Sequence, residues 1–125
     1  MLAKYPVVPT LPAVDLQRAR KFYEETLGLG SPASSSEADV MYELGQGSRL
    51  YLYQREQTRA DHTAFSFIVD DVEQEVKELK EKGVAFESFD FPGFEMVDNI
   101  ASWQGGKAAW FKDSEGNIIA LTQTA

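Results

Sequence analysis

An internal repeat limits the possible folds of this 125-residue chain more than any other feature of its sequence. Each half contains a predicted strand, then a helix that begins at an aspartate, then a glycine followed by an aliphatic residue, at Gly28 and Gly83. The segments that close the halves also match, because residues 40–52 align without gaps on residues 109–121. The repeat predicts an α+β fold of two tandem β-α-β-β-β modules forming a cupped mixed sheet. One helix can cover only one face of each module, so the modules must cooperate to enclose the other face.

The boundaries of the predicted helices follow from capping residues and apolar spacing. The first helix begins at Asp15, a favourable N-cap, and ends at Gly28. The second begins at Asp70, with Glu73 as its capping-box partner, and ends at Gly83. Strands are predicted at residues 7–13, 40–44, 49–53, 62–69, 107–112 and 117–122, with shorter ones near 30–34 and 84–87.

The length of the chain is that of one domain with a core of its own. We expect a single domain over residues 1–125, with the first module at about residues 5–54 and the second at about 62–123. The polar stretch 55–61 then connects the two modules.

Composition and charge exclude several classes of function. The net charge of −8 repels phosphate backbones, so a nucleic-acid partner is not expected. The chain has no cysteine, which excludes disulfides, thiolate metal sites and cysteine nucleophiles. No apolar run approaches the ~20 residues that span a bilayer, and the first residues lack the apolar stretch of a secretory signal. We therefore expect a cytoplasmic protein without a membrane partner.

Alternation along the strands separates two faces of the predicted sheet. The strongly apolar set should lie under the helices and comprises Leu11, Leu50, Leu52, Phe65, Phe67, Ile119 and Leu121. The opposite set mixes small, aromatic and polar groups and comprises Val8, Thr10, Arg49, Tyr51, Tyr53, His62, Ala64, Ser66, Ile118, Ala120 and Thr122. Such a lining suits a ligand cavity. The alternative is that this face packs against a dimer partner, and the two interpretations are compatible.

Three stretches of the sequence resemble motifs of the vicinal oxygen chelate superfamily, which contains glyoxalase, bleomycin-resistance and dioxygenase proteins. The first-module motif is carried by Val14-Asp15-Leu16, Phe22-Tyr23 and Leu27-Gly28-Leu29, and the second by residues 69–72 and 82–84. Residues 109–117 resemble the closing hairpin of the family, with Ser114 in place of the usual proline. The resemblance covers nearly the whole chain. It implies the fold rather than a reaction, because this fold hosts many chemistries.

The resemblance also identifies the positions where metal-dependent members bind a divalent ion through His, Gln or Glu. In this sequence those positions are Val8, Tyr51, Ala64 and Ala120, of which only Tyr51 is even a marginal ligand. We therefore expect no metal and no other cofactor. His62, the one histidine of the sequence, is interpreted as a strand-end residue near solvent, although a bulge could turn it inward.

These observations leave three functional hypotheses. The first is metal-independent binding of a small organic molecule in the sheet cavity of a homodimer. The second is a glyoxalase-like lyase, isomerase or dioxygenase whose metal site is misregistered in this alignment. The third is a divergent member whose cavity is filled and whose role is assembly. No catalytic residue is assigned, and the candidate ligand-binding residues are Thr10, Arg49, Tyr51, Tyr53, Ala64, Ser66, Ala120 and Thr122.

The candidate residues suggest what kind of ligand to expect. Tyr51 and Tyr53 stand two apart on one predicted strand, so both rings should face a flat or aromatic ligand. Arg49 favours an acidic group on the ligand, whereas the net charge favours a cation, and we expect the nearby arginine to outweigh the screened field. The apolar stretch 89–96 is either a loop that covers the core or a lid over the cavity.

Overall fold

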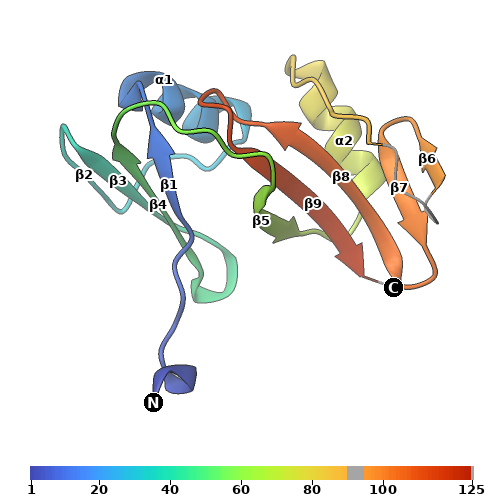
Figure 1. The fold of residues 1–125 in the computed structure, drawn as a ribbon, viewed down its shortest axis with the longest axis horizontal. Helices are drawn as coiled ribbons and strands as arrows, with labels where there is room; N and C mark the ends of the chain where they lie inside the picture. Colours follow the sequence, from blue (N-terminus) through green and yellow to red (C-terminus); the bar gives the residue numbers. More distant parts are fainter. Residues whose placement is uncertain (90–94, 125) are drawn as a thin grey trace. The chain divides into compact units, whose positions relative to one another are not determined.

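A computed structural model describes residues 1–89 and 95–124 of the chain, which form two compact units that divide between Thr58 and Arg59. This division falls inside the polar stretch 55–61 that separates the predicted modules. Each unit has its own sheet and its own α-helix (Figure 1). The α+β fold is therefore confirmed, and the described residues form two mixed sheets, one of four strands and one of five.

The first unit is a β-α-β-β-β module. It contains η1 (Leu2–Lys4), β1 (Thr10–Ala13), α1 (Leu16–Lys21), the π-helical turn η2 (Phe22–Thr26), β2 (Ser34–Ser35), β3 (Asp39–Glu43), η3 (Gly45–Gly47) and β4 (Arg49–Gln54). The strand order is β1-β4-β3-β2, with β1 parallel to β4 and the other pairs antiparallel. Asp15 is the N-cap of α1, as predicted, and its side chain accepts a hydrogen bond from the Arg18 amide.

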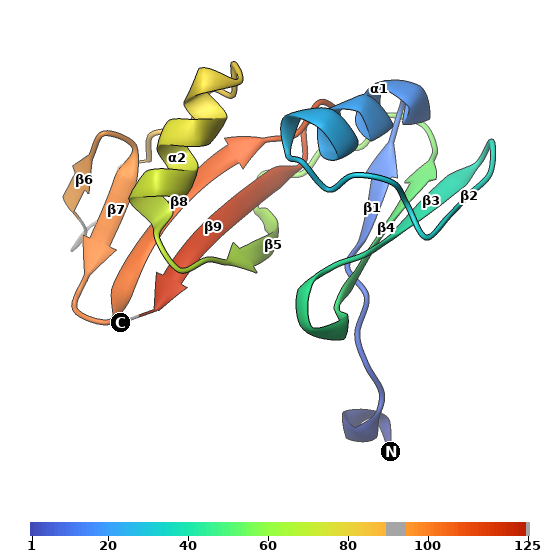
Figure 2. The ribbon, with the colours of Figure 1, turned by 180° about the vertical axis from the view of Figure 1, so that it is seen from behind.

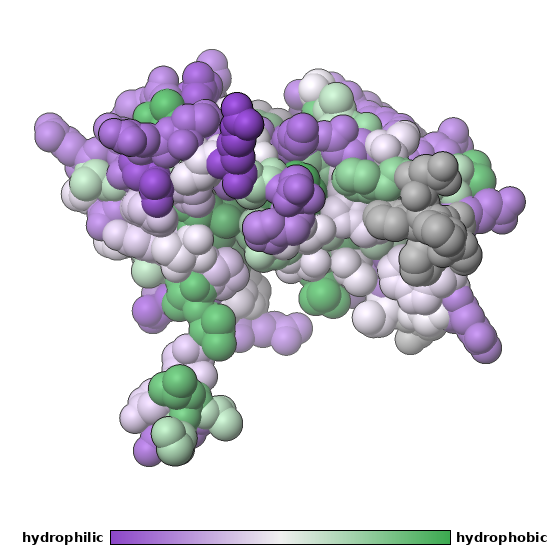
Figure 3. Space-filling view, viewed as in Figure 1, coloured by the Kyte–Doolittle hydropathy of each residue, from purple (hydrophilic) through white to green (hydrophobic). Residues whose placement is uncertain are grey.

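The N-terminal segment before β1 contributes no buried side chain. Met1, Leu2 and Val7 are exposed, and the segment extends away from β1 with apolar groups on its surface (Figures 1 and 3). The strand predicted from residue 7 begins only at Thr10, and just before it the Pro9 carbonyl accepts a hydrogen bond from the Tyr51 amide.

The second unit repeats the module and adds one strand. It contains β5 (Thr63–Ile68), α2 (Val72–Glu81), β6 (Glu95–Val97), β7 (Ile100–Trp103), β8 (Gly106–Lys112) and β9 (Ile118–Thr124). The order is β5-β9-β8-β7-β6, with β5 parallel to β9. Helix α2 lies against one face of this sheet (Figure 2). No helix in the two described stretches is long and apolar enough to cross a membrane.

Three predictions about the second unit were wrong in detail. The N-cap of α2 is Asp71, which accepts from the Gln74 amide, so the Asp70–Glu73 capping box does not form. Residues 84–87 make only an isolated bridge between Phe86 and Phe111 instead of a strand. Strands β6 and β7 were not predicted, and Met96 of the expected loop lies in β6, while residues 90–94 of that loop lie outside the described residues.

The predicted alternation is seen in the burial pattern of β4, whereas along β9 Ile118 and Ala120 of the opposite set are buried as well. Five of the seven residues that were expected under the helices are buried, namely Leu11, Leu50, Leu52, Ile119 and Leu121. Phe65 and Phe67 lie on the same face as Ile119 and Leu121 but are only half-buried, on the edge strand β5. Burial of these apolar side chains against α1 and α2 supplies the main stabilisation of each unit.

A polar network joins the π-helical turn to the first sheet. The Tyr42 hydroxyl, on a side chain that is 1% exposed, donates to Glu24 Oε2 at 2.9 Å. Arg20 Nε donates to the same oxygen at 2.6 Å, and this hydrogen bond, assisted by that from Tyr42, lowers the pKa of Glu24. Burial, together with the hydrogen bond to Glu24, raises the pKa of Tyr42. The Glu24 carboxylate therefore links the helix to a buried phenol of β3.

Replacing Glu24 by Gln is expected to lower the free energy of unfolding by about 1 kcal/mol at neutral pH, because charge-assisted hydrogen bonds to Arg20 and Tyr42 are weakened. The folded-state pKa of Glu24 is depressed, so its contribution is present above the pKa of the unfolded carboxyl and is lost as pH falls through the folded value. Urea titrations over a pH series should show the gap between wild type and variant narrowing in acid. A gap of constant size, or the same loss in the exposed control Glu37→Gln, would contradict this account.

Candidate functional site

The face of the first sheet opposite α1, here called the helix-free face, brings together four of the predicted site residues. Arg49, Tyr51 and Tyr53 alternate along β4 with the buried Leu50 and Leu52. Thr10 of β1 lies beside Tyr51 in the parallel register. The same face carries three residues of β3 that the sequence pattern did not assign to the site, Asp39 opposite Tyr53, Met41 opposite Tyr51 and Glu43 opposite Arg49.

Tyr51 and Tyr53 form the aromatic centre of this face. Their rings are stacked, with centroids 6.3 Å apart and an interplanar angle of 16°. Both side chains are half-buried, so each ring leaves part of its surface accessible to a ligand. Two phenols in this arrangement present flat apolar faces next to polar hydroxyls.

Asp39 adds a fixed carboxylate beside the tyrosine pair. The Tyr51 hydroxyl donates to Asp39 Oδ2 at 2.6 Å, and the Ser36 hydroxyl donates to Asp39 Oδ1 at 2.8 Å. These hydrogen bonds, that from Tyr51 first, hold the pKa of Asp39 below its usual range, and the same bond to Asp39 raises the pKa of Tyr51. The carboxylate is thus ionised and oriented at neutral pH.

Arg49 lies at the end of the same face with a partner of its own. Its Nη2 atom is 3.6 Å from Glu43 Oε1, and the two side chains are 53% and 64% exposed. An ion pair with this exposure is weak, but it balances the charge of Arg49 locally. The net charge of the helix-free face, from Asp39, Glu43 and Arg49, is therefore negative.

The remaining predicted residues lie in the second unit. Ser66 pairs with Ala120, and Thr122 pairs with Ile68, on the face of the second sheet opposite α2. Ser66 is exposed and Ala120 is buried. The strand register shifts between Thr63 and Phe65, so Thr63 and not Ala64 lies opposite Ile118. His62 lies just before β5, and its side chain is 76% exposed.

Trp110, on this second face, was not predicted as a site residue, and Phe89 beside it belongs to the stretch 89–96 that was interpreted as a loop or a lid. Trp110 Nε1 donates to the Thr63 hydroxyl at 3.1 Å, and the ring meets Phe89 edge to face with centroids 5.5 Å apart. Trp110 pairs with Ala120 across β8 and β9, as Met41 pairs with Tyr51 in the first unit. This correspondence could have been found in the sequence, because the gap-free alignment of residues 40–52 on 109–121 places Trp110 on Met41.

The four positions that correspond to metal ligands do not fit a divalent ion. Val8, Ala64 and Ala120 have no donor atom, and the Tyr51 hydroxyl already donates to Asp39. In the part of the chain that the structure describes, no three His, Asp or Glu side chains gather in a group that could hold a metal ion. The donor chemistry of these residues therefore gives no basis for a metal-dependent step.

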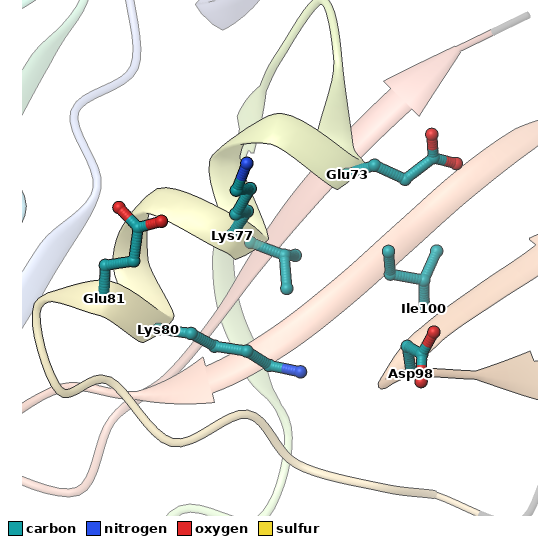
Figure 4. Close-up of a pocket in the computed structure, with 7 residues that line it drawn as sticks. Glu73, Lys77, Lys80, Glu81, Asp98 and Ile100 are labelled. Atoms are coloured by element: carbon teal, nitrogen blue, oxygen red, sulfur yellow. The ribbon is translucent and has the colours of Figure 1, made fainter.

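A groove of about 520 Å³ lies on the other face of the second sheet, beside α2 (Figure 4). Val76 of α2 and Ile100 of β7 contribute its apolar part. Charged side chains of both signs form the rest of the lining: Glu73, Lys77, Lys80, Glu81 and Asp98. Lys80 donates to Asn99, and Glu73 pairs with Lys107, so part of this charge is already engaged within the unit. None of the predicted site residues lines this groove.

Comparisons with known proteins agree with the module architecture. A family model described as the Glyoxalase/Bleomycin resistance protein/Dioxygenase superfamily matches residues 7–121. No curated protein matches the sequence significantly. Among solved structures, an integron cassette protein from the mobile metagenome of the Halifax Harbour sewage outfall is 21% identical with a TM-score of 0.73, covering 96% of this chain and 98% of the other.

Two further structures show the range of proteins that share this fold. TnmS3, an antibiotic binding protein from Streptomyces sp. CB03234, is 23% identical with a TM-score of 0.68 over 100% of this chain and 99% of its own. A lactoylglutathione lyase from Agrobacterium tumefaciens is 18% identical with a TM-score of 0.70 over 98% and 96%. Identities this low establish similarity of fold alone. With the family model matched across residues 7–121, the chain belongs to the glyoxalase/bleomycin resistance protein/dioxygenase superfamily.

Proposed function

We propose that this protein binds a small, flat organic molecule against Tyr51 and Tyr53 on the helix-free face of its first sheet, without a metal ion. The observation that carries the proposal is the parallel, half-buried tyrosine pair with the oriented Asp39 carboxylate beside it. An antibiotic binding protein of the same fold, TnmS3, is consistent with a binding role. The lyase of the same fold is the alternative, and the absence of donors at the corresponding metal positions argues against it here.

The tyrosine pair supplies both contact area and hydrogen bonding. The two rings are nearly parallel, with an interplanar angle of 16°, so a flat guest can lie against the accessible part of each ring. In the described part of the chain the Tyr53 hydroxyl has no hydrogen-bond partner, and it can therefore serve a polar atom at the edge of the guest.

Removing both rings tests the proposal. A calorimetric or fluorescence screen of flat aromatic compounds should find ligands with micromolar-scale affinity, on the order of 8 kcal/mol. The double variant Tyr51→Ala, Tyr53→Ala is expected to lose this binding while keeping a cooperative thermal transition. The matched control is Tyr5→Ala, which removes an exposed tyrosine of the same unit and should bind as wild type does. If the double variant binds the ligand with the affinity of wild type, the ligand does not bind at the tyrosine pair and the proposal is wrong.

Metal content is a separate expectation, motivated by the side chains at Val8, Ala64 and Ala120. Elemental analysis of purified protein should find no stoichiometric Zn, Ni, Mn or Fe, and added metal should leave the melting temperature unchanged. About one bound ion per chain, whose removal by a chelator lowers the melting temperature, would instead support the metal-dependent enzyme hypothesis.

A further inference from the structure

We propose that the ligand of this site is a flat organic cation, and that Asp39 is the residue that selects for positive charge. This inference rests on the proposed function of the tyrosine pair and adds the chemical class of its ligand. It reverses the preference for an acidic ligand that the sequence alone suggested from Arg49.

The charge of Asp39 is not neutralised by its own surroundings. Both carboxylate oxygens accept hydrogen bonds from neutral hydroxyls, Oδ2 from Tyr51 and Oδ1 from Ser36. These bonds orient the carboxylate without removing its charge, and each oxygen retains a second lone pair. Among the described residues, no lysine or arginine lies within ion-pair distance of Asp39. The carboxylate is therefore held beside the tyrosine rings with its charge available to a ligand.

Arg49 attracts an anionic ligand less strongly than Asp39 attracts a cationic one. Its guanidinium pairs with Glu43, its cross-strand neighbour, so an anionic ligand would have to compete with a carboxylate already present. Asp39 lies directly opposite Tyr53 on the neighbouring strand. Arg49 and Glu43 form a cross-strand pair at the other end of β4, on the far side of Tyr51 from Tyr53. The uncompensated charge therefore lies on the side of the aromatic pair that Asp39 occupies.

Aromatic rings and a carboxylate recognise the same kind of molecule. The face of a tyrosine ring attracts cations through its quadrupole, and a flat cation can also stack on it. A neighbouring carboxylate adds a direct attraction that acts on the charged ligand alone. A neutral flat molecule would gain only the stacking contact, and a flat anion would be repelled by Asp39.

Three acridines of nearly the same shape separate these contributions: N-methylacridinium as the cation, acridine as the neutral form, and acridine carboxylate as the anion. Calorimetric titration of the full chain should show the cation binding about three- to tenfold more tightly than acridine, and the anion most weakly. Asp39→Asn keeps an acceptor for the Tyr51 hydroxyl and should reduce the preference for the cation to the part that the tyrosine rings contribute. Asp61→Asn removes the same charge from an exposed position in the other unit and should keep the preference.

The outcomes distinguish the two proposals. Equal binding of the three acridines, lost in the Tyr51→Ala, Tyr53→Ala variant, would overturn the role of Asp39 and leave the proposed function intact. A cation preference of unchanged size in Asp39→Asn would also overturn it. Binding that persists in the tyrosine variant, or no binding of any of the three to wild type, would contradict both. In wild type, added NaCl should weaken the binding of N-methylacridinium more than the binding of acridine. An equal loss of affinity for the two would count against selection by charge.

Discussion

Replacing Leu121 by Ala is expected to lower the free energy of unfolding by about 2–5 kcal/mol, because a large apolar side chain is removed from the core of the second unit. Leu121 lies in the middle of β9, is 4% exposed, and pairs with Ala109 on one side and Phe67 on the other. Its truncation removes buried apolar surface and leaves a cavity on the α2 side of the sheet. Urea unfolding followed by circular dichroism measures the loss as a shift of the midpoint at constant slope.

Ser66→Ala is the matched control on the opposite face of the same sheet. Ser66 is exposed on β5, so its replacement should change stability by about 0.5 kcal/mol or less. Phe65 shares the face of Leu121 but is half-buried, and its truncation should cost less than that of Leu121. Equal losses for Leu121→Ala and Ser66→Ala would mean that the two faces of the sheet are assigned the wrong way round.

Gly106→Ala is expected to lower stability by about 1–3 kcal/mol, because there is no room for a side chain at this position. A Cβ atom on Gly106 would lie 2.2 Å from the backbone carbonyl oxygen of Gln123, on the neighbouring strand β9. The contact is with backbone, so it can be relieved only by separating β8 from β9 at this end of the strand pair.

Gly45→Ala serves as the control for this substitution. A Cβ atom at Gly45 would meet nothing within 4 Å, and Gly45 does not have a left-handed backbone conformation. Thermal unfolding should therefore leave Gly45→Ala close to wild type and lower the melting temperature of Gly106→Ala. A Gly106→Ala protein as stable as wild type would show that the two strands can part at this pair without cost.

Features that depend on local spacing could be predicted from the sequence. The alternation of Leu50 and Leu52 with Tyr51 and Tyr53 fixes which side chains share a face, because successive residues of a strand point in opposite directions. The repeat predicts the same order of strands and helix in both halves, because both halves have the same spacing of apolar side chains to bury. The helix ends at Gly28 and Gly83 follow from their left-handed backbone conformations, with φ of 76° and 90°.

Features that depend on contacts between distant segments could not be predicted. Asp70 and Asp71 are equally good caps in the sequence, and the choice of Asp71 coincides with a hydrogen bond from the Val72 amide to the Gln123 side chain of β9. The partnership of Asp39 with Tyr51 needs the register of β3 on β4, and the bulge at Ala64 needs the pairing of β5 with β9. Such registers are set by tertiary packing, which local patterns do not contain.

A structure of the protein with a bound flat aromatic ligand tests the central claim most directly. The account predicts the ligand in contact with the rings of Tyr51 and Tyr53, with the charged end of a cationic ligand toward Asp39. The groove beside α2, with Val76 and Ile100 in its lining, is the alternative place for a small molecule (Figure 4). A ligand seated in that groove, with the two tyrosine rings free of it, would contradict the assignment of the helix-free face as the binding site.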